Sequence, residues 1–332
     1  MFNLFSRAPT YDPQRDIPDQ TGKVFLITGA NAGLGYQITK QLAAKGATIY
    51  LACRSEERAL AAINQLEDEV DDVQGKNRLQ FLQVDMSSMR SVKRAADEFL
   101  KRESRLDVLL HNAGRLIDAY ELSEDGIELC VAVNHLGVHV LTQSLLPLLK
   151  KTAAFSDCDV RVLVTSSSGH AQAPRNAKMD SIEAWNDHSG IKGDHFIARA
   201  QRYGNSKLMN IMWAMHLQKL CDEEKVPITV LALDPGMILT GGAISTSPWY
   251  IYWLIRLFGV NEEEGAYTSL FCATSATVRE KRETYKGKYV KPVGVLAVPY
   301  HRDARDENKA RILWDASVRI ADELLSRHVA TT

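Results

Sequence analysis

From residue 23 onward, short apolar runs alternate with longer stretches in which apolar positions recur at helical spacing. A short, continuous apolar run is typical of a strand buried on both faces of a sheet. We therefore predict strands at residues 24–28, 47–53, 79–84, 106–110, 160–165, 228–233 and 289–298. The intervening stretches predict helices at residues 34–44, 55–69, 89–102, 124–150 and 198–223, and a charged amphipathic helix that runs to the end.

The regular alternation of strands and helices determines the predicted architecture. Consecutive parallel strands need crossover connections, and right-handed crossovers place helices on both faces of the sheet. We therefore expect an α/β fold with a single doubly wound parallel sheet. No repeat or linker divides the chain, so we predict one domain at 23–332. Residues 1–22, which contain Pro9, Pro13 and Pro18, are predicted to form an arm that lies over the surface.

Composition narrows the class of protein. The 332 residues are 45% hydrophobic and 24% charged, which is typical of a globular protein and excludes a disordered chain. Forty basic and 41 acidic residues give a net charge of -1, so we expect no nucleic-acid partner. Five scattered cysteines with no C-x-x-C pair favour a reducing compartment, and we predict a cytoplasmic protein.

A glycine-rich turn follows the first predicted strand and reads Thr28-Gly29-Ala30-Asn31-Ala32-Gly33-Leu34-Gly35. Glycines at such a turn let the backbone approach a pyrophosphate, which binds at the positive N-terminal end of the next helix. An ordinary tight turn between strand and helix is the alternative. Its place between a buried strand and a helix favours nucleotide binding.

The end of the second predicted strand bears on the choice between NAD and NADP. An acidic side chain there binds the ribose 2′-hydroxyl of NAD. This chain has Arg54 instead, whose forked donors and charge suit the 2′-phosphate of NADP. Glu56 and Glu57 lie close by, so NAD stays open as the alternative. We predict NADP(H) as the cofactor.

Tyr203 and Lys207 are four residues apart on a predicted helix, so the phenol and the ammonium share one face. A neighbouring positive charge stabilises the phenolate and lowers the tyrosine pKa, which would suit Tyr203 to proton transfer. Tyr36 and Lys40 have the same spacing, but they lie in the helix that would meet the pyrophosphate. We therefore assign proton transfer to the pair at Tyr203.

Seven short motifs follow one another along the chain: Thr28-Gly29-x-x-x-Gly33-x-Gly35, Asp85-Met86, Asn112-Ala113-Gly114, Asn134, Ser166-Ser167, Tyr203-x-x-x-Lys207 and Pro235-Gly236. In this order they resemble the short-chain dehydrogenase/reductase family, over roughly residues 23–298. The chain looks most like the retinol-dehydrogenase-like and WW-domain-oxidoreductase-like branch, on three cues: Ala52-Cys53-Arg54, Asn134-His135-Leu136-Gly137 and Tyr203-Gly204-Asn205-Ser206-Lys207-Leu208. No WW domain is visible. The resemblance implies a Rossmann-type sheet.

The resemblance implies four catalytic residues. Tyr203 would exchange a proton with the substrate oxygen while a hydride moves to or from the nicotinamide. Ser167, chosen by register from Ser166-Ser167-Ser168, would hydrogen-bond that oxygen as charge develops. Lys207 would hold the nicotinamide ribose and lower the Tyr203 pKa, and Asn134 would place a water that relays the proton to solvent.

The resemblance also implies cofactor contacts outside the glycine turn. Asp85 and Met86 would contact the adenine. Asn112, followed by Ala113 and Gly114, would contact the adenine-side ribose and the backbone. Further contacts, to the carboxamide and diphosphate, are expected from Pro235, Gly236, Met237 and Thr240.

Two segments are candidates for the substrate side. Residues 168–198 form an insertion longer than in most members of the family, and Trp185, His188, His195 and Phe196 in it are expected to wall the pocket. Residues 240–260 correspond to the substrate lid, and the aromatic run at 248–258 suggests a bulky hydrophobic substrate. Packing on the core and a peripheral membrane contact through 248–260 are the alternatives.

These expectations combine into one predicted function. The chain would be an NADP(H)-dependent oxidoreductase that interconverts a carbonyl and an alcohol on a bulky hydrophobic small molecule, in the reductive direction. A catalytically silent dinucleotide-binding sensor or scaffold is the alternative. His135 and His139 are four residues apart but lack the glutamate of a zinc-binding helix, so we predict no metal. The chain is expected to be a monomer or a homodimer.

Overall fold

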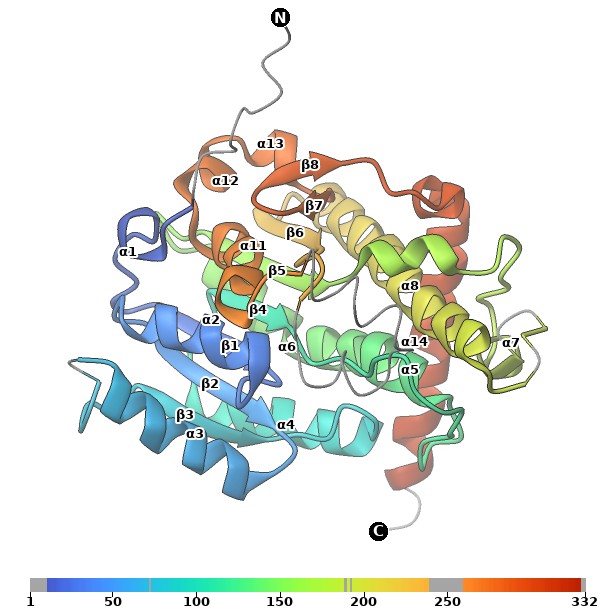
Figure 1. Ribbon diagram of the computed structural model, residues 1–332, viewed down its shortest axis with the longest axis horizontal. Helices are drawn as coiled ribbons and strands as arrows, with labels where there is room; N and C mark the ends of the chain where they lie inside the picture. The colour runs from blue at the N-terminus through green and yellow to red at the C-terminus, as the bar shows by residue number, and fades with distance from the viewer. Residues whose placement is uncertain (1–10, 72, 188–189, 192, 239–258, 330–332) are drawn as a thin grey trace, which may run out of the picture.

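The computed structural model describes residues 11–71, 73–187, 190–191, 193–238 and 259–329. The named strands form one sheet in the order β3-β2-β1-β4-β5-β6-β7-β8, with β3 at one edge and β8 at the other (Figure 1). Their bounds are β1 (Val24–Thr28), β2 (Thr48–Cys53), β3 (Leu79–Gln83), β4 (Val108–His111), β5 (Val160–Thr165), β6 (Ile228–Leu233), β7 (Tyr289–Lys291) and β8 (Val295–Ala297). Strands β1 to β7 pair in parallel and β8 pairs antiparallel with β7.

Helices cover both faces of this sheet (Figure 1). The core on one face packs against α2 (Gly33–Ala43), α3 (Glu56–Glu69), α11 (Glu262–Thr274), α12 (Ala276–Glu280) and α13 (Arg282–Tyr285). The core on the other face packs against α4 (Met89–Arg102), α6 (Gly137–Ala153), α8 (Phe196–Glu223) and α14 (Glu307–Val329). Shorter helical segments are α1 (Pro13–Asp16), α5 (Leu129–Val131), the π-helical η1 (Ala132–Leu136), η2 (Ser168–Gln172), α7 (Ile182–Asp187) and η3 (Arg302–Arg305). The predicted doubly wound α/β fold is confirmed, except that β8 is antiparallel.

The strand order places the site. The chain passes from β1 through β2 to β3 on one side, and then continues with β4 on the other side of β1. The connections that leave the carboxyl ends of β1 and β4 therefore run in opposite directions, which makes this place a topological switch point. Open α/β sheets bind their ligands at such a point. The glycine turn and Asn112 follow these two strands.

Two predicted elements differ in the structure. The helix predicted at 124–150 begins instead at Leu129, because Gly126 adopts a left-handed φ of 75° and Leu122 pairs with Glu128 in a β-bridge. The Glu128 carboxylate then accepts a hydrogen bond from the Val131 N–H and caps the new helix. The strand predicted at 289–298 is a hairpin, β7 and β8, whose turn contains Gly294 at a φ of 72°.

The predicted arm is partly built into the fold. Ile17 is buried in the core that faces α11, and the Tyr11 ring lies 5.4 Å from the ring of Tyr267. Residues 1–10 lie outside the described part of the chain.

Buried histidines form hydrogen bonds with side chains of the helices on one face of the sheet. His135 Nε2 lies 2.8 Å from Ser317 Oγ of α14, and His139 Nδ1 accepts a hydrogen bond from Trp213 of α8 at 3.2 Å. His111, at the end of β4, lies 2.8 Å from Thr142 Oγ1. Among the described residues, 129–153 form the one helical stretch long and apolar enough to span a membrane, but 78% of its most apolar window is buried in the protein. It therefore packs as a core helix.

We predict that the free energy of unfolding falls steeply below pH 6.5. Burial lowers the pKa of His111, His135 and His139 to about 3, so these rings stay neutral in the folded chain. Unfolding exposes them to their ordinary pKa of about 6.5, and the unfolded chain then takes up protons that the folded chain does not. Stability from this source is complete above that pH and declines at about 4 kcal/mol per pH unit well below it.

Urea unfolding between pH 8 and 5 measures this slope, and His135→Gln is the matched comparison. Glutamine can keep a hydrogen bond to Ser317 but does not titrate, so the slope should fall by about 1.4 kcal/mol per pH unit. An unchanged slope in His135→Gln contradicts the prediction.

Candidate active site

A cavity of about 410 Å³ opens at the switch point of the sheet. Most of its lining comes from the segments that directly follow β1, β2, β3 and β4: Gly29 and Asn31; Arg54, Ser55 and Arg58; Asp85 and Met86; Ala113, Gly114, Arg115, Leu116 and Asp118. Seven of the residues predicted to bind a cofactor are in this set: Gly29, Asn31, Arg54, Asp85, Met86, Ala113 and Gly114. Thr28, another of the predicted residues, is not among the described lining residues.

The glycine turn is held in place by hydrogen bonds between the ends of β1 and β4. Thr28 Oγ1 accepts from the backbone N–H groups of Asn112 and Ala113, both at 3.0 Å. The Asn112 side-chain amide donates to the carbonyl oxygens of Thr28 and Gly29, at 3.0 and 3.2 Å. A Cβ added at Gly35 would lie 2.2 Å from the Gly29 oxygen, so only glycine fits there. Asn112 thus fixes the turn rather than presenting its amide to the cavity.

The residues of this turn fit a dinucleotide. Helix α2 begins at Gly33, and its N-cap residue Ala32 makes no side-chain hydrogen bond to the helix. The first N–H groups of a helix have no partner within the helix, so here they can bind an anion such as a diphosphate. Gly29 and Gly33 adopt left-handed φ values of 66° and 54°, which glycine accommodates without strain. Gly33 and Leu34, as the first residues of the helix, lie where this anion would bind.

Two arginines line the cavity where the chain leaves β2. Arg54 was singled out in the sequence, and Arg58, which sequence reasoning missed, lines the same cavity from the first turn of α3. The signal that could have found Arg58 is its position in the first turn of α3, directly after the strand end that carries Arg54. Glu56 and Glu57 are exposed, and neither is among the described lining residues.

Tyr203 lies on α8 and forms a hydrogen bond with the Ser167 side chain. The other two serines of the run are placed differently: the Ser166 hydroxyl donates to the Lys207 carbonyl at 2.8 Å, and Ser168 is exposed. The Ser167 carbonyl accepts from His170 Nδ1 at 2.6 Å. Of the three serines, Ser167 is therefore the one that the fold holds against the phenol.

Lys207 and Asn134 complete this polar cluster. Lys207 Nζ donates to the Thr165 carbonyl at 2.8 Å and lies 5.6 Å from the centre of the Tyr203 ring. Asn134 Nδ2 donates to Ser206 Oγ at 2.9 Å. A Cβ added at Gly114 would lie 3.3 Å from Asn134 Oδ1 and 3.4 Å from Lys207 Nζ. Because Gly114 also lines the cavity, the cavity adjoins the polar cluster.

Asn134 lies in the π-helical turn η1, which sequence periodicity could not predict. Such turns occur frequently at functional sites because they widen a helix locally. Here the Asn134 side chain turns toward the loop after β4, where Nδ2 donates to the Arg115 carbonyl at 3.0 Å and Oδ1 accepts from the Arg115 N–H at 2.7 Å.

Burial dominates the electrostatics of the cluster. It raises the pKa of Tyr203 to about 12, against the opposing effect of the Ser167 hydrogen bond. It also lowers the pKa of Lys207 to about 8. The lowering of the Tyr203 pKa that we expected from Lys207 is not found: burial raises this pKa, and the influence that lowers it is the Ser167 hydrogen bond. Sequence reasoning also missed Asp234, a buried carboxylate that raises the Tyr203 pKa further and accepts a hydrogen bond from Tyr289 at 2.8 Å.

The second tyrosine–lysine pair, Tyr36 and Lys40, has a structural role. Lys40 Nζ forms an ion pair with Glu69 of α3 at 2.8 Å, and burial beside the same carboxylate raises the pKa of Tyr36. Neither Tyr36 nor Lys40 lines the described cavity. The distinction drawn from the sequence between the two pairs agrees with this placement.

Only some of the residues after β6 that we expected to contact the cofactor belong to the described part of the chain. Pro235 and Gly236 follow the strand directly, and Gly236 adopts a left-handed φ of 85°. Ile238 forms a β-bridge with Val260, so the two ends of the intervening segment meet. Thr240 and the aromatic run at 248–258 lie outside the described residues, as does most of the predicted lid at 240–260.

The insertion at 168–198 contains two short helical segments, η2 and α7. Trp185 does not wall the pocket: it is fully buried in the core and packs edge-on against His135 at 5.6 Å. His195 is exposed and caps α8 by accepting from the Ala198 N–H. His188 lies outside the described residues.

Comparisons with known proteins agree with these motifs. The short chain dehydrogenase family model matches residues 23–177. The short chain dehydrogenase/reductase dpchH of Colletotrichum higginsianum is 43% identical over 303 residues, which cover 90% of this chain and 75% of that protein. Retinol dehydrogenase 11 of Mus musculus is 32% identical over 299 residues, which cover 89% of this chain and 85% of that protein.

A solved structure shows the same fold. The crystal structure of a protein from Mycobacterium paratuberculosis superimposes with a TM-score of 0.70 at 26% identity, covering 94% of this chain and 97% of that one. Together with the sequence relatives, this similarity settles the family. The chain belongs to the short-chain dehydrogenase/reductase family of oxidoreductases, in its retinol-dehydrogenase-like branch.

Proposed function

We propose that this protein is an NADP(H)-dependent oxidoreductase that interconverts a carbonyl and an alcohol on a bulky hydrophobic small molecule, in the reductive direction. The observation that carries this proposal is the polar cluster of Ser167, Tyr203, Lys207 and Asn134 beside a cavity that fits a dinucleotide. A silent binding module would need the cavity but not these four groups in contact range.

The cluster is suited to donate a proton to a carbonyl oxygen. When bound, the nicotinamide nucleotide supplies the hydride. With a pKa raised to about 12, Tyr203 keeps its proton at neutral pH and can serve as the acid. The Ser167 hydroxyl donates a hydrogen bond to the same substrate oxygen and stabilises the charge that develops on it.

Lys207 and Asn134 support the proton transfer. A Lys207 pKa of about 8 leaves the ammonium mostly charged at neutral pH, where it stabilises the Tyr203 phenolate after the proton has left. The same pKa lets the lysine pass a proton readily to Tyr203. The Asn134 side chain, held by the Arg115 backbone, places the water that connects Lys207 to solvent.

The preference for NADP(H) rests on Arg54 and Arg58. Two guanidinium groups on one side of the cavity suit a 2′-phosphate, which a guanidinium binds through paired, charge-assisted hydrogen bonds. An NAD site would present a carboxylate at the end of β2 to the ribose hydroxyls. The glutamates that follow β2 do not reach the described lining.

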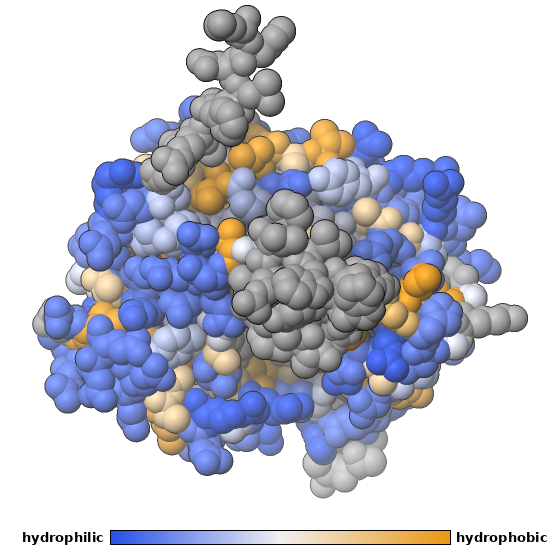
Figure 2. All heavy atoms as spheres, viewed as in Figure 1, coloured by the Kyte–Doolittle hydropathy of each residue, from blue (hydrophilic) through white to orange (hydrophobic). Residues whose placement is uncertain are grey.

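The proposal of a hydrophobic substrate is supported by exposed apolar side chains in the loops near the site. Leu116 and Met237, which follow β4 and β6, and Ile197 at the start of α8 are all more than a third exposed. Apolar residues are visible on both sides of the centre of this face in Figure 2. One relative is named as a retinol dehydrogenase, which fits a substrate of this kind.

Replacing Tyr203 by Phe tests the catalytic assignment. We expect the rate of NADPH oxidation with hydrophobic aldehydes and ketones to fall roughly a hundredfold or more, because the proton donor is lost. NADPH binding, measured by fluorescence, should stay nearly unchanged. Tyr36→Phe, at the second tyrosine–lysine pair, is the matched control and should keep full turnover. Undiminished turnover in Tyr203→Phe rules out the proton role, and a wild-type protein that binds NADPH but reduces no carbonyl favours the silent module.

Replacing Arg54 and Arg58 by Gln, singly and together, tests the cofactor preference. Each substitution removes a charge-assisted contact to the 2′-phosphate, so KM for NADPH should rise about tenfold per arginine while KM for NADH stays nearly constant. Arg311→Gln provides the control, since Arg311 is exposed and pairs with Asp315 on α14, outside the cavity lining. Equal changes for both cofactors would refute the assignment.

A further inference from the structure

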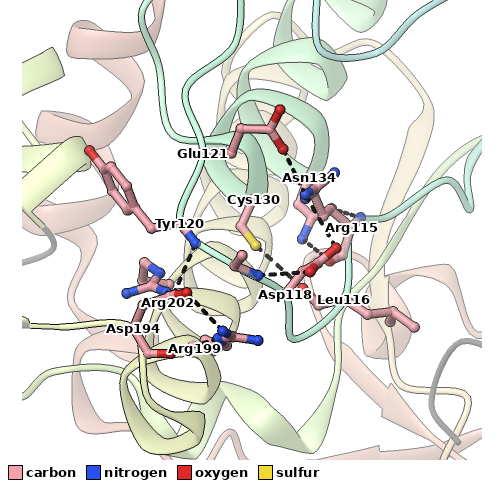
Figure 3. A network of polar contacts seen from close by, with 11 residues as sticks. Arg115, Leu116, Asp118, Tyr120, Glu121, Cys130, Asn134, Asp194, Arg199 and Arg202 are labelled. Atoms are coloured by element: carbon pink, nitrogen blue, oxygen red, sulfur yellow. Dashed lines mark hydrogen bonds and ion pairs between the residues drawn. The ribbon is translucent and has the colours of Figure 1, made fainter. Parts of the chain in front are cut away.

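Asp194, at the end of the insertion, joins the loop after β4 to the start of α8 (Figure 3). Its Oδ1 accepts from the Tyr120 N–H at 3.0 Å, in the loop after β4. Its carboxylate also forms ion pairs with two arginines of the first turns of α8: Arg199, at 2.8 Å, and Arg202. We refer to Tyr120, Asp194 and Arg202 as the clasp.

Arg202 is the unusual member of the clasp because its side chain is only 2% exposed. It directly precedes Tyr203 and donates a second hydrogen bond to the Gly193 carbonyl at 3.1 Å. Its guanidinium lies 5.4 Å from the centre of the Tyr120 ring. Burying an arginine is costly, and its partner Asp194 is 39% exposed, so solvent screens the ion pair and weakens its contribution to stability. The clasp is therefore better explained by positioning than by stability.

The loop that carries Tyr120 also forms part of the cavity wall. Leu116 and Asp118 line the cavity, and the Arg115 backbone binds the Asn134 side chain at both its N–H and its carbonyl. The Arg115 guanidinium pairs with Asp118 and Glu121 at 3.2 and 3.1 Å. The loop is thus attached at one end to Asn134 and at the other to the clasp, as Figure 3 shows.

We infer that the clasp is a positioning device that fixes the cavity wall at residues 115–121 relative to Tyr203, so that cofactor binding and placement of the phenol depend on each other. This inference rests on the proposed function for its catalytic part. Arg202 is a positioning residue: it holds the start of α8 against the loop through Asp194 and Tyr120. Loss of its guanidinium frees both the wall and the helix turn that carries Tyr203.

The test compares Arg202→Met with Arg199→Met. Methionine fills the space of the buried stem, and Asp194 keeps Arg199 and the Tyr120 N–H as partners, so no buried charge is left alone. Arg199 contacts the same carboxylate, but its side chain is 37% exposed and it does not directly precede the phenol. The measurements are the Kd for NADPH by fluorescence, the melting temperature, and kcat at saturating NADPH with a hydrophobic carbonyl.

We expect Arg202→Met to raise the Kd several-fold and to lower kcat roughly tenfold or more, because small displacements of a catalytic group are costly. Arg199→Met should change both by less than about twofold. Arg202→Lys should recover part of the loss, since it keeps the charge but not the planar, multidentate contact. A merely structural role would lower the melting temperature and leave Kd and kcat unchanged.

The inference is overturned if Arg202→Met keeps both the Kd and kcat of the wild-type protein. If this variant does not fold, Asp194→Asn takes its place, because the amide oxygen still accepts from Tyr120 but loses the charge that holds Arg202. Failure of the proposed function gives a different result from failure of the inference. The wild-type protein would then reduce no carbonyl, but the comparison of Kd values for NADPH would still decide whether the clasp fixes the cavity wall.

Discussion

Parallel pairing brings the carboxyl ends of β1, β2, β4, β5 and β6 to one edge of the sheet, and the proposed chemistry depends on this constraint. Residues at these ends lie far apart in sequence, yet the Thr28 hydroxyl and the Asn112 amide bind each other's backbone across the switch point. The same edge places Ser167 after β5 beside Tyr203 on the helix that follows. The cavity and the polar cluster are therefore consequences of one topology.

Desolvation then sets the protonation states at that edge. Burial favours the neutral form of every ionisable group, so it raises the pKa of Tyr203 and lowers that of Lys207. Tyr203 is therefore a proton donor at neutral pH, and the neighbouring Lys207 titrates close to neutral pH. A protonated Tyr203 can donate a proton to a carbonyl oxygen, as the proposed reduction requires. Asp234, buried nearby, raises the Tyr203 pKa further because its charge opposes the phenolate.

Much of this could be predicted from the sequence, because local patterns determine it. The helix at 89–102 and the strands at 160–165 and 228–233 have the predicted bounds, since apolar periodicity and flanking polar residues mark their ends. Residues tied to strand ends, such as Arg54 and Asn112, also lie where topology requires. The position of Ser167 beside Tyr203 follows from the same logic.

What the sequence could not predict depends on particular hydrogen bonds, ion pairs and packing contacts. The cap that Glu128 forms and the π-helical turn at Asn134 arise from local competition between hydrogen bonds that apolar periodicity does not record. Trp185 was expected at the pocket because aromatic residues suit both a pocket and a core, and only packing against His135 decides between them. The ion pair of Arg202 with Asp194 leaves no trace in the sequence pattern.

The most direct test of the central claim is a crystal structure of the protein with NADP⁺ and a hydrophobic ketone. The account predicts the 2′-phosphate against the two arginines that follow β2, and the ketone oxygen within hydrogen-bond distance, roughly 3 Å, of both Tyr203 and Ser167. A nucleotide bound elsewhere, or a ketone oxygen that contacts neither side chain, would contradict it.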